Sequence, residues 1–285
     1  MNRSTAIRQA ALFFALTIGL SFLVFWGPLA LFQVPAISFV SNTNGPVWAI
    51  ILFMLGGFVP SLVGLLLTGI FEGRAGLRQM GRWVIQFKIG WRWYLAALGV
   101  IGFASLIQVI TASLLGTPFD LSLFGQQLSS LLPLIILGPL SEELGWRGYA
   151  QDRLQTVFSP ASAGIVLGVL WALWHLPLFY MPGTAQHELS LPFLPFLLTL
   201  VGLSVVFAWL HHQTGGSIWT AIFFHWVYTY ASQVISSSLG QNPLYNWLAC
   251  APYLIVAGLI LFFWKARPQA AGAKSVVGDM NALHP

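Results

Sequence analysis

The stretch Leu140-Ser-Glu-Glu-Leu-Gly-Trp-Arg-Gly-Tyr149 places two adjacent carboxylates and one guanidinium inside a long apolar part of the sequence. The chain has only 7 acidic residues among 285, and Glu142 and Glu143 are two of them. A charged side chain at the centre of a bilayer costs about 2.5–3.5 kcal/mol on insertion scales, so such residues mark functional sites or pathways. Two histidines, His175 and His225, follow on later apolar segments. The pattern predicts chemistry inside a membrane.

The composition indicates a membrane protein. Hydrophobic residues make up 57% of the chain and charged residues 7%, whereas soluble domains carry about 25% charged residues. Eight apolar segments of about 20 residues are each long enough to cross about 30 Å of hydrocarbon as a helix. We therefore predict an all-α, polytopic integral membrane bundle of about eight transmembrane helices. The predicted spans are residues 9–32, 46–70, 93–116, 127–155, 161–181, 191–211, 217–237 and 246–264.

Basic residues fall on one side of these spans. If the N-terminus is cytoplasmic, eleven of the 12 Lys and Arg residues lie on the cytoplasmic side, and Arg147 lies within a span. The opposite loops, near residues 33–45, 117–126, 182–190 and 238–245, contain Asp120, His187 and Glu188 but no Lys or Arg. By the positive-inside rule we predict that both termini are cytoplasmic. The expected location is a bacterial or archaeal plasma membrane.

We expect one transmembrane domain over residues 1–267. Within it, residues 72–90 carry apolar side chains on one helical face and Arg74, Arg78 and Arg82 on another. This predicts an amphipathic helix on the inner leaflet, held by anionic lipid headgroups or used to dock substrate. Residues 268–285 show no apolar periodicity and are expected to form a disordered cytoplasmic tail. The sequence contains no nucleic-acid module, so membrane lipid is the expected surface partner.

The two acids of the opening stretch point in different directions on a helix. Glu143 and Arg147 are four residues apart and can pair, whereas Glu142 is turned by about 100° from Glu143. Glu142 is then free to act as a general base. The alternative is a purely structural network of both acids with Arg147.

Two later helices supply histidines. His175 lies at a depth similar to that of Glu142, and Pro177 removes a backbone hydrogen bond beside it. His225 and Thr229 are four residues apart and share a face, so both can donate into one cavity. The remaining histidines, His187, His211, His212 and His284, are expected to be solvated.

These residues support two mechanisms. In the first, Glu142 and His175 hold and deprotonate a water that attacks a peptide carbonyl, and His225 with Thr229 stabilises the oxyanion. In the second, Glu142, His175 and His225 bind Zn²⁺, which acidifies the water. No His-Glu-x-x-His helix is present, so the zinc mechanism rests on ligand types alone.

At these residues the chain resembles the CPBP family of CAAX prenyl proteases and bacteriocin-processing enzymes. The family hallmark is Glu-Glu-x-x-x-Arg, Phe-x-x-x-His and His-x-x-x-Asn on successive membrane helices. Glu142, Glu143 and Arg147 match the first motif. In the second, His175 matches and Trp171 replaces Phe; in the third, His225 matches and Thr229 replaces Asn.

The resemblance implies an intramembrane endopeptidase with Glu142 as general base, His175 as its partner on the water and His225 as oxyanion donor. It also implies that Glu143 and Arg147 support the site, and that position 229 helps bind the oxyanion or a metal. Prenylated CAAX or bacteriocin-like peptides and lipid-anchored proteins are the implied substrates.

Several alternatives stay open. Some family members are non-catalytic scaffolds or immunity proteins, which the Thr229 replacement favours here, and a proton-coupled transporter is a further alternative. A cavity opening to the inner leaflet, where the basic residues cluster, would suit lipid-anchored or single-span substrates. Gly164 and Gly168 can pack helices within one molecule or between two, so the sequence leaves the oligomeric state open.

Overall fold

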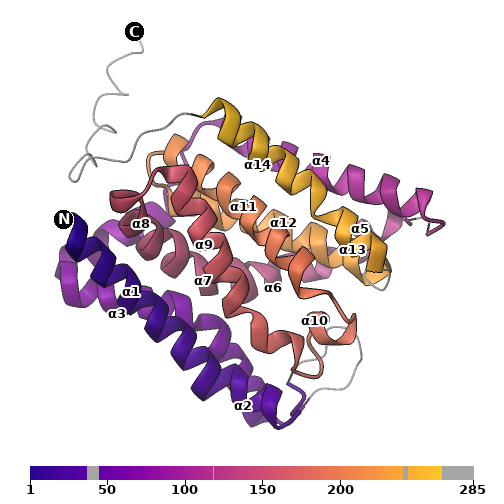
Figure 1. Cartoon of the computed structure of the whole chain (residues 1–285), viewed down its shortest axis with the longest axis horizontal. Coiled ribbons are helices and arrows are strands. Elements are labelled where there is room, and N and C mark those ends of the chain that lie inside the picture. The colour runs from indigo at the N-terminus through magenta and orange to yellow at the C-terminus, as the bar shows by residue number, and fades with distance from the viewer. Residues whose placement is uncertain (37–44, 118, 240–242, 265–285) are drawn as a thin grey trace.

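The computed structural model describes residues 1–36, 45–117, 119–239 and 243–264, which form a bundle of helices joined by turns (Figure 1). Helices are the only regular secondary structure of this described part. The predicted disordered tail, residues 268–285, lies outside the described residues. The elements are α1 (Arg3–Leu20), η1 (Ser21–Phe25), α2 (Trp26–Leu31), α3 (Val47–Val84), α4 (Trp91–Leu114), α5 (Ser122–Gln126), η2 (Leu128–Ser130), α6 (Leu131–Ile135), η3 (Ile136–Leu140), α7 (Ser141–Gly145), η4 (Trp146–Ala150), α8 (Gln151–Val157), α9 (Pro160–Trp174), η5 (Leu176–Phe179), α10 (Ala185–Glu188), α11 (Phe193–Gln213), α12 (Ile218–Leu239), α13 (Pro243–Ala249) and α14 (Ala251–Phe263).

Within the described residues, six helical segments are long and apolar enough to cross a membrane: Arg3–Leu31, Val47–Val84, Trp91–Leu114, Leu128–Val157, Phe193–Gln213 and Leu244–Phe263. Large apolar side chains on them are exposed, as Leu23 (80%), Leu114 (83%) and Phe263 (75%) illustrate, and lipid is the solvent that suits such a surface. The protein is therefore an all-α, multi-pass integral membrane protein.

Two of the eight predicted spans fall outside this set. The segment predicted at 161–181 contains α9, which is apolar but ends after 15 residues at Trp174. It continues as the 3₁₀ turn η5, with Pro177 inside the first turn. The segment predicted at 217–237 is the 22-residue helix α12, whose sequence contains several Ser, Thr and Tyr residues. α9 thus falls outside the set because of its length, whereas α12 contributes polar side chains such as His225 and Thr229 to the interior.

The bundle has two distinct ends. We call one the basic end: it contains the start of α1, the end of α3, the starts of α4 and α12 and the end of α8. Arg3 Nη2 donates to the Val157 carbonyl at 3.0 Å, and Ser217 Oγ donates to the Gln86 carbonyl at 3.3 Å. These contacts hold the termini of four helices together at that end.

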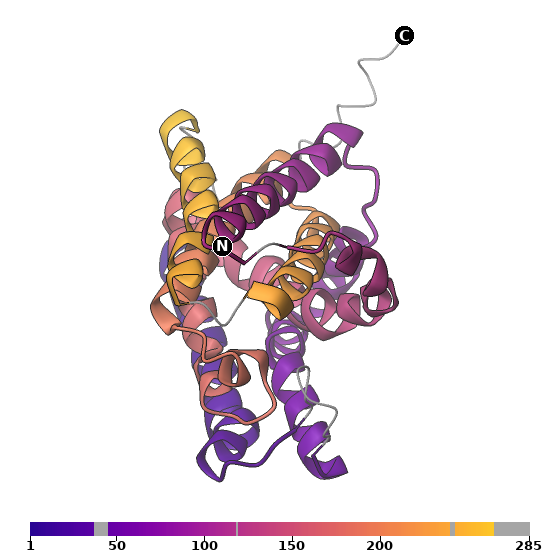
Figure 2. The ribbon, with the colours of Figure 1, turned by 90° about the vertical axis from the view of Figure 1, so that its right-hand side faces the viewer.

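We call the other the loop end: it contains residues 33–36, α5, α10 and α13. Gln33 Nε2 donates to the Tyr180 carbonyl at 2.9 Å, and the Tyr230 hydroxyl donates to the Phe124 carbonyl. The two ends lie on opposite sides of Figure 1, with the N-terminus at one and α10 at the other. Figure 2 turns the side bearing α5, α10 and α13 toward the viewer.

Glycines bring the central helices close together. A Cβ on Gly64 of α3 would lie 2.8 Å from Gly145 Cα, and a Cβ on Gly145 would lie 2.2 Å from the Pro60 carbonyl oxygen. Gly164 and Gly168 make the same kind of approach between α9 and α11, since added Cβ atoms would lie 2.8 Å and 2.7 Å from the α11 backbone. Small residues allow this packing in membranes, and here α9 uses its glycines within one molecule.

A kink interrupts α3 where the amphipathic helix is predicted. Gly73 has φ 63° and ψ −156°, a conformation that glycine adopts without a side-chain penalty. The remainder of α3 continues to Val84 at a changed angle. The placement of residues 72–90 on the inner leaflet stays a prediction.

The segment that carries the two acids is irregular. Helix α7 has only five residues and lies between two π-helical turns, η3 and η4. The Gln151 N–H donates to the Trp146 carbonyl, the five-residue spacing of a π turn, which accommodates one extra residue. Such turns occur frequently at functional sites, and here two of them flank Glu142 and Glu143.

Candidate active site

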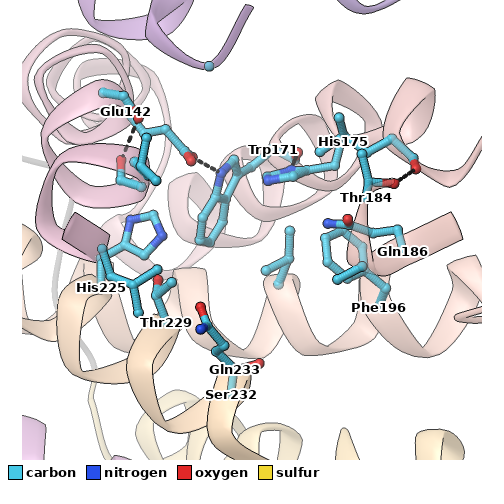
Figure 3. Close-up of a pocket in the computed structure, with 18 of the residues that line it drawn as sticks. Glu142, Trp171, His175, Thr184, Gln186, Phe196, His225, Thr229, Ser232 and Gln233 are labelled. Carbon is cyan, nitrogen blue, oxygen red and sulfur yellow. Dashed lines mark hydrogen bonds between the residues drawn. The ribbon is translucent and has the colours of Figure 1, made fainter. Parts of the chain in front are cut away.

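A cavity of about 310 Å³ lies between α3, α9, α11 and α12, and the loop-end segment around α10 also lines it. Its walls are mainly aromatic and aliphatic. Four of the predicted site residues line it: Glu142, His175, His225 and Thr229 (Figure 3). Glu143 and Arg147 are absent from its described lining, and both are fully buried.

Two tryptophans hold Glu142. The indole Nε1 of Trp171 donates to Glu142 Oε2 at 2.6 Å, and the indole Nε1 of Trp146 donates to the same oxygen at 3.3 Å. Glu142 is only 6% exposed. Because both described donors bind Oε2, the other carboxylate oxygen is left for a water in the cavity.

The sequence interpretation missed these donors. It treated Trp171 only as an aromatic replacement for Phe, although an indole N–H is a hydrogen-bond donor and a phenyl ring has none. Trp146 lies four residues after Glu142, which places both on one helical face. Two signals were available in the sequence. One was the four-residue spacing of Glu142 and Trp146, and the other was that a buried carboxylate requires hydrogen-bond donors.

Glu143 is the centre of a buried network. Arg147 Nη1 donates to Glu143 Oε1 at 2.9 Å and to Oε2 at 3.1 Å, so the predicted pair is present. Arg147 Nη2 donates to Ser204 Oγ on α11 at 3.2 Å. His225 Nδ1 of α12 lies 2.6 Å from Glu143 Oε1. One carboxylate therefore joins three helical segments.

Aromatic rings complete the surroundings of Arg147. Its guanidinium carbon lies 3.8 Å from the ring centroid of Phe207 and 4.6 Å from that of Trp171. Cation–π contacts of a desolvated guanidinium contribute about 2 kcal/mol. A cation with no exposed surface is thus balanced by one carboxylate, one hydroxyl and two ring faces.

His175 caps the end of α9. Its Nδ1 lies 2.8 Å from the Trp171 carbonyl oxygen. Because a carbonyl only accepts, Nδ1 carries the hydrogen and Nε2 presents a lone pair. The ring packs edge-on against Trp174 and Phe196, with centroids at 4.7 Å and 5.3 Å. Figure 3 shows Trp171 between Glu142 and His175, so one tryptophan contacts both.

His225 and Thr229 face the cavity from one side of α12 (Figure 3). A Cβ on Gly138 would lie 3.5 Å from His225 Nε2 and 3.6 Å from Thr229 Oγ1. Both polar atoms therefore lie against the same glycine of η3. Since His225 Nδ1 is used by Glu143, Nε2 is the ring atom available to a ligand.

The three candidate zinc ligands line one cavity but do not form a metal-binding cluster. In the described ranges there is no group of three His, Cys, Asp or Glu side chains that could hold a metal ion. Glu143 and the Trp171 carbonyl bind the two Nδ1 atoms, and tryptophans bind one Glu142 oxygen, so both Nε2 atoms and the other oxygen are left. As placed in the structure, the three side chains are not grouped as metal ligands.

One expectation about the other histidines is wrong. His211 is buried, with 3% exposure, and its Nε2 lies 3.3 Å from Asp152 Oδ1. It lies near the end of α11, where packing against α8 covers it. His187, by contrast, is partly exposed, 3.4 Å from Glu188 Oε1.

Comparison with known proteins adds independent information. Residues 124–231 match the family described as type II CAAX prenyl endopeptidase, Rce1-like. The matched range contains all six predicted site residues. Over these residues the chain is similar to that family, which supports the resemblance to the CPBP family. Of the residues that match the CPBP motifs, Glu142, His175 and His225 line the cavity. The other two, Glu143 and Arg147, form the buried ion pair behind it.

A curated CPBP relative supports the same grouping. The protein described as CAAX prenyl protease 2 from Methanococcus maripaludis is 29% identical over 168 residues. The match covers 54% of this chain and 61% of the relative. The chain thus matches less than two thirds of the relative's length.

Proposed function

We propose that the protein is an intramembrane endopeptidase in which Glu142 activates a water for attack on a peptide carbonyl. The observation that carries this proposal is the different use of the two adjacent acids. Glu143 is fully buried and bound by Arg147 and His225, whereas Glu142 lines the cavity. A carboxylate beside a cavity, held by two donors on one oxygen, is suited to accept a proton from water.

His175 acts on the same water in this mechanism. Its Nε2 carries a lone pair, because Nδ1 donates to the Trp171 carbonyl, and can accept a hydrogen bond from the water. The attacking oxygen is then held between two acceptors. The proton that leaves the water passes to Glu142 and afterwards to the departing amine, so proton transfer balances over one turnover.

His225 and Thr229 stabilise the oxyanion of the tetrahedral intermediate. Glu143 holds the Nδ1 hydrogen of His225, and Nε2 donates to the oxyanion when the ring is doubly protonated. The Thr229 hydroxyl is the second donor on the same face. Preorganised donors of this kind contribute about 2.7–4 kcal/mol each to the rate.

The substrate proposed is a membrane-associated peptide or a lipid-anchored protein. The cavity is lined mainly by apolar side chains and lies inside a bundle of membrane-length helices. The printed activity of the relative, a CAAX prenyl protease, makes prenylated peptides the first class to test, and bacteriocin-like peptides the second.

The test compares purified wild-type protein with Glu142→Gln on a panel of prenylated and non-prenylated membrane-anchored peptides. We expect cleavage by the wild type and a decrease of about 10²–10⁴-fold in the variant, the usual contribution of a general base. Asp120→Asn is the matched control, because Asp120 is an exposed acid outside the cavity. A fully active Glu142→Gln variant would contradict the mechanism.

The same panel tests the alternatives. Each assay is repeated with a zinc chelator, and with zinc added back. Loss and recovery of activity would show that a metal is required, contrary to the arrangement described above. Absence of cleavage by the wild type across the panel would favour a scaffold or immunity protein.

A further inference from the structure

The N-terminal helical segment reaches the cavity through one side chain. α1, η1 and α2 form one apolar segment, Arg3–Leu31, which lies outside the range that matches the family, residues 124–231. α1 and α2 follow one another along α3 (Figure 1). Trp26, the first residue of α2, is the only described residue of this segment that lines the cavity. Trp26 is therefore the point at which a segment outside the matched range meets the candidate active site.

Trp26 is fixed to α3 in two ways. Its indole Nε1 donates to the Phe53 carbonyl at 2.8 Å. A Cβ on Gly56 would overlap the indole ring, so glycine leaves the space that the ring needs on the surface of α3. The π turn η1 lies directly before Trp26, whose backbone N–H donates to the Ser21 carbonyl. The ring is thus held by a hydrogen bond, by a glycine notch and by its own helix.

The same segment also holds a tryptophan beside His175. The indole Nε1 of Trp174 donates to Ser21 Oγ at 2.7 Å. The ring centroids of Trp26 and Trp174 are 4.5 Å apart, and that of His175 lies 6.4 Å from Trp26 and 4.7 Å from Trp174. Trp26 therefore bounds the part of the cavity next to the imidazole that is proposed to bind the attacking water.

The surface that Trp26 offers to a ligand is apolar and has a fixed shape. Its N–H is already bonded to the Phe53 carbonyl, so ring carbons are what remains to face the cavity. The side chain is buried, with 3% exposure. Met54 and Phe58 continue the same wall on α3. A ring that is buried and hydrogen-bonded cannot turn aside for a larger ligand without losing both kinds of contact.

We propose that Trp26 is a specificity-determining residue, which limits the size of the substrate side chain that binds beside His175. The proposal rests on the proposed function, because it requires the peptide to bind in this cavity. A hydrophobic pocket discriminates between side chains that differ by one methylene by about 10–200-fold. A smaller side chain at position 26 leaves room for a larger one on the substrate, so the preference for size is expected to shift.

The experiment compares the purified full-length wild type with Trp26→Leu. The substrates are peptides of one sequence in which the residues around the cleaved bond are changed singly to Ala, Leu, Phe or Trp, and kcat/KM is measured for each. Trp91→Leu is the matched control, because Trp91 is 67% exposed and is not among the residues that line the cavity. Ser21→Ala is a second control, since it removes the partner of Trp174 and leaves the ring of Trp26 in place.

We expect the ratio of kcat/KM for the Phe or Trp peptide to that for the Ala peptide to rise at least about tenfold at one position in Trp26→Leu. The ratio is expected to stay unchanged in Trp91→Leu. Ser21→Ala is expected to lower kcat/KM for all peptides by the same factor. An unchanged ratio in Trp26→Leu would overturn the proposal. If Trp26→Leu does not fold, Trp26→Phe, which keeps a smaller ring in the notch, is expected to shift the ratio in the same direction, and an unchanged ratio there would overturn it.

A binding measurement separates this proposal from the proposed function. Dissociation constants of the same peptides, carrying a fluorescent label, are measured by anisotropy for Glu142→Gln with and without Trp26→Leu. A shift toward larger side chains, without cleavage by the wild type, would support the role of Trp26 and reject the proposed function. Cleavage by the wild type with no shift in either measurement would reject the role of Trp26 alone. Binding of no peptide to either protein would also overturn the proposal, because the wall would then select nothing.

Discussion

Removing one indole N–H at the cavity is the sharpest test of how Glu142 is held. Trp171→Phe keeps an aromatic ring at this position and deletes the donor that lies 2.6 Å from Glu142 Oε2. A hydrogen bond to a charged group contributes about 1.5–3 kcal/mol. If that interaction positions the carboxylate in the transition state, kcat falls by roughly 10- to 150-fold.

Trp146→Phe is the matched comparison. Its indole donates to the same oxygen at 3.3 Å, beyond the usual range of about 2.7–3.2 Å for such bonds. A weaker hydrogen bond contributes about 0.5–1.5 kcal/mol, so we expect a decrease in kcat of less than about tenfold. The two variants together separate loss of a donor from loss of a tryptophan.

The assay measures kcat and KM on a cleaved peptide, together with the thermal unfolding midpoint in detergent. A positioning role predicts that kcat falls in Trp171→Phe while KM stays within about twofold of the wild-type value. A purely structural role would lower the unfolding midpoint and the active fraction instead. An unchanged kcat in Trp171→Phe, or a larger decrease in Trp146→Phe, would refute the reasoning.

Three further outcomes are expected. Arg147→Leu leaves Glu143 buried without its cation and is expected to destabilise the fold by about 3–5 kcal/mol, measured as a lower unfolding midpoint; a midpoint equal to that of the wild type would contradict this. Gly145→Ala places a Cβ 2.2 Å from the Pro60 carbonyl and is expected to abolish folded expression, whereas Gly99→Ala, with open space around it, serves as the tolerated control. Thr229→Val removes one oxyanion donor and is expected to lower kcat by about 10²–10³-fold, while Thr229→Asn, with a longer side chain, is expected to raise it; the opposite order would remove Thr229 from the oxyanion site.

The sequence was informative wherever a feature depended on local spacing. The Glu143–Arg147 contact follows from four-residue spacing on a helix, and the long apolar segments correspond to membrane-length helices. His175 shares a cavity with Glu142, which comparable depth along their separate helices had suggested. These inferences needed only helical geometry and the cost of burying charge.

Features that depend on contacts between distant segments could not be predicted in the same way. The hydrogen bond from Trp171 to Glu142 joins residues 29 positions apart, and the burial of His211 depends on α8 packing against it. The apolar pattern also did not predict that α9 ends at Trp174, because the following turn η5 is hydrophobic as well. Hydropathy measures the hydrophobicity of a segment and does not indicate where a helix ends.

The two π-helical turns around α7 have a consequence for how this site can change over evolution. Each turn holds one residue more than a regular helix would need. Deleting a single codon within Ile136–Leu140 or Trp146–Ala150 would return that turn to a regular helix and would leave the two flanks facing nearly as before, because the wide turn absorbs the extra residue. The segment can therefore lose one codon at either turn while the paired acids keep their direction.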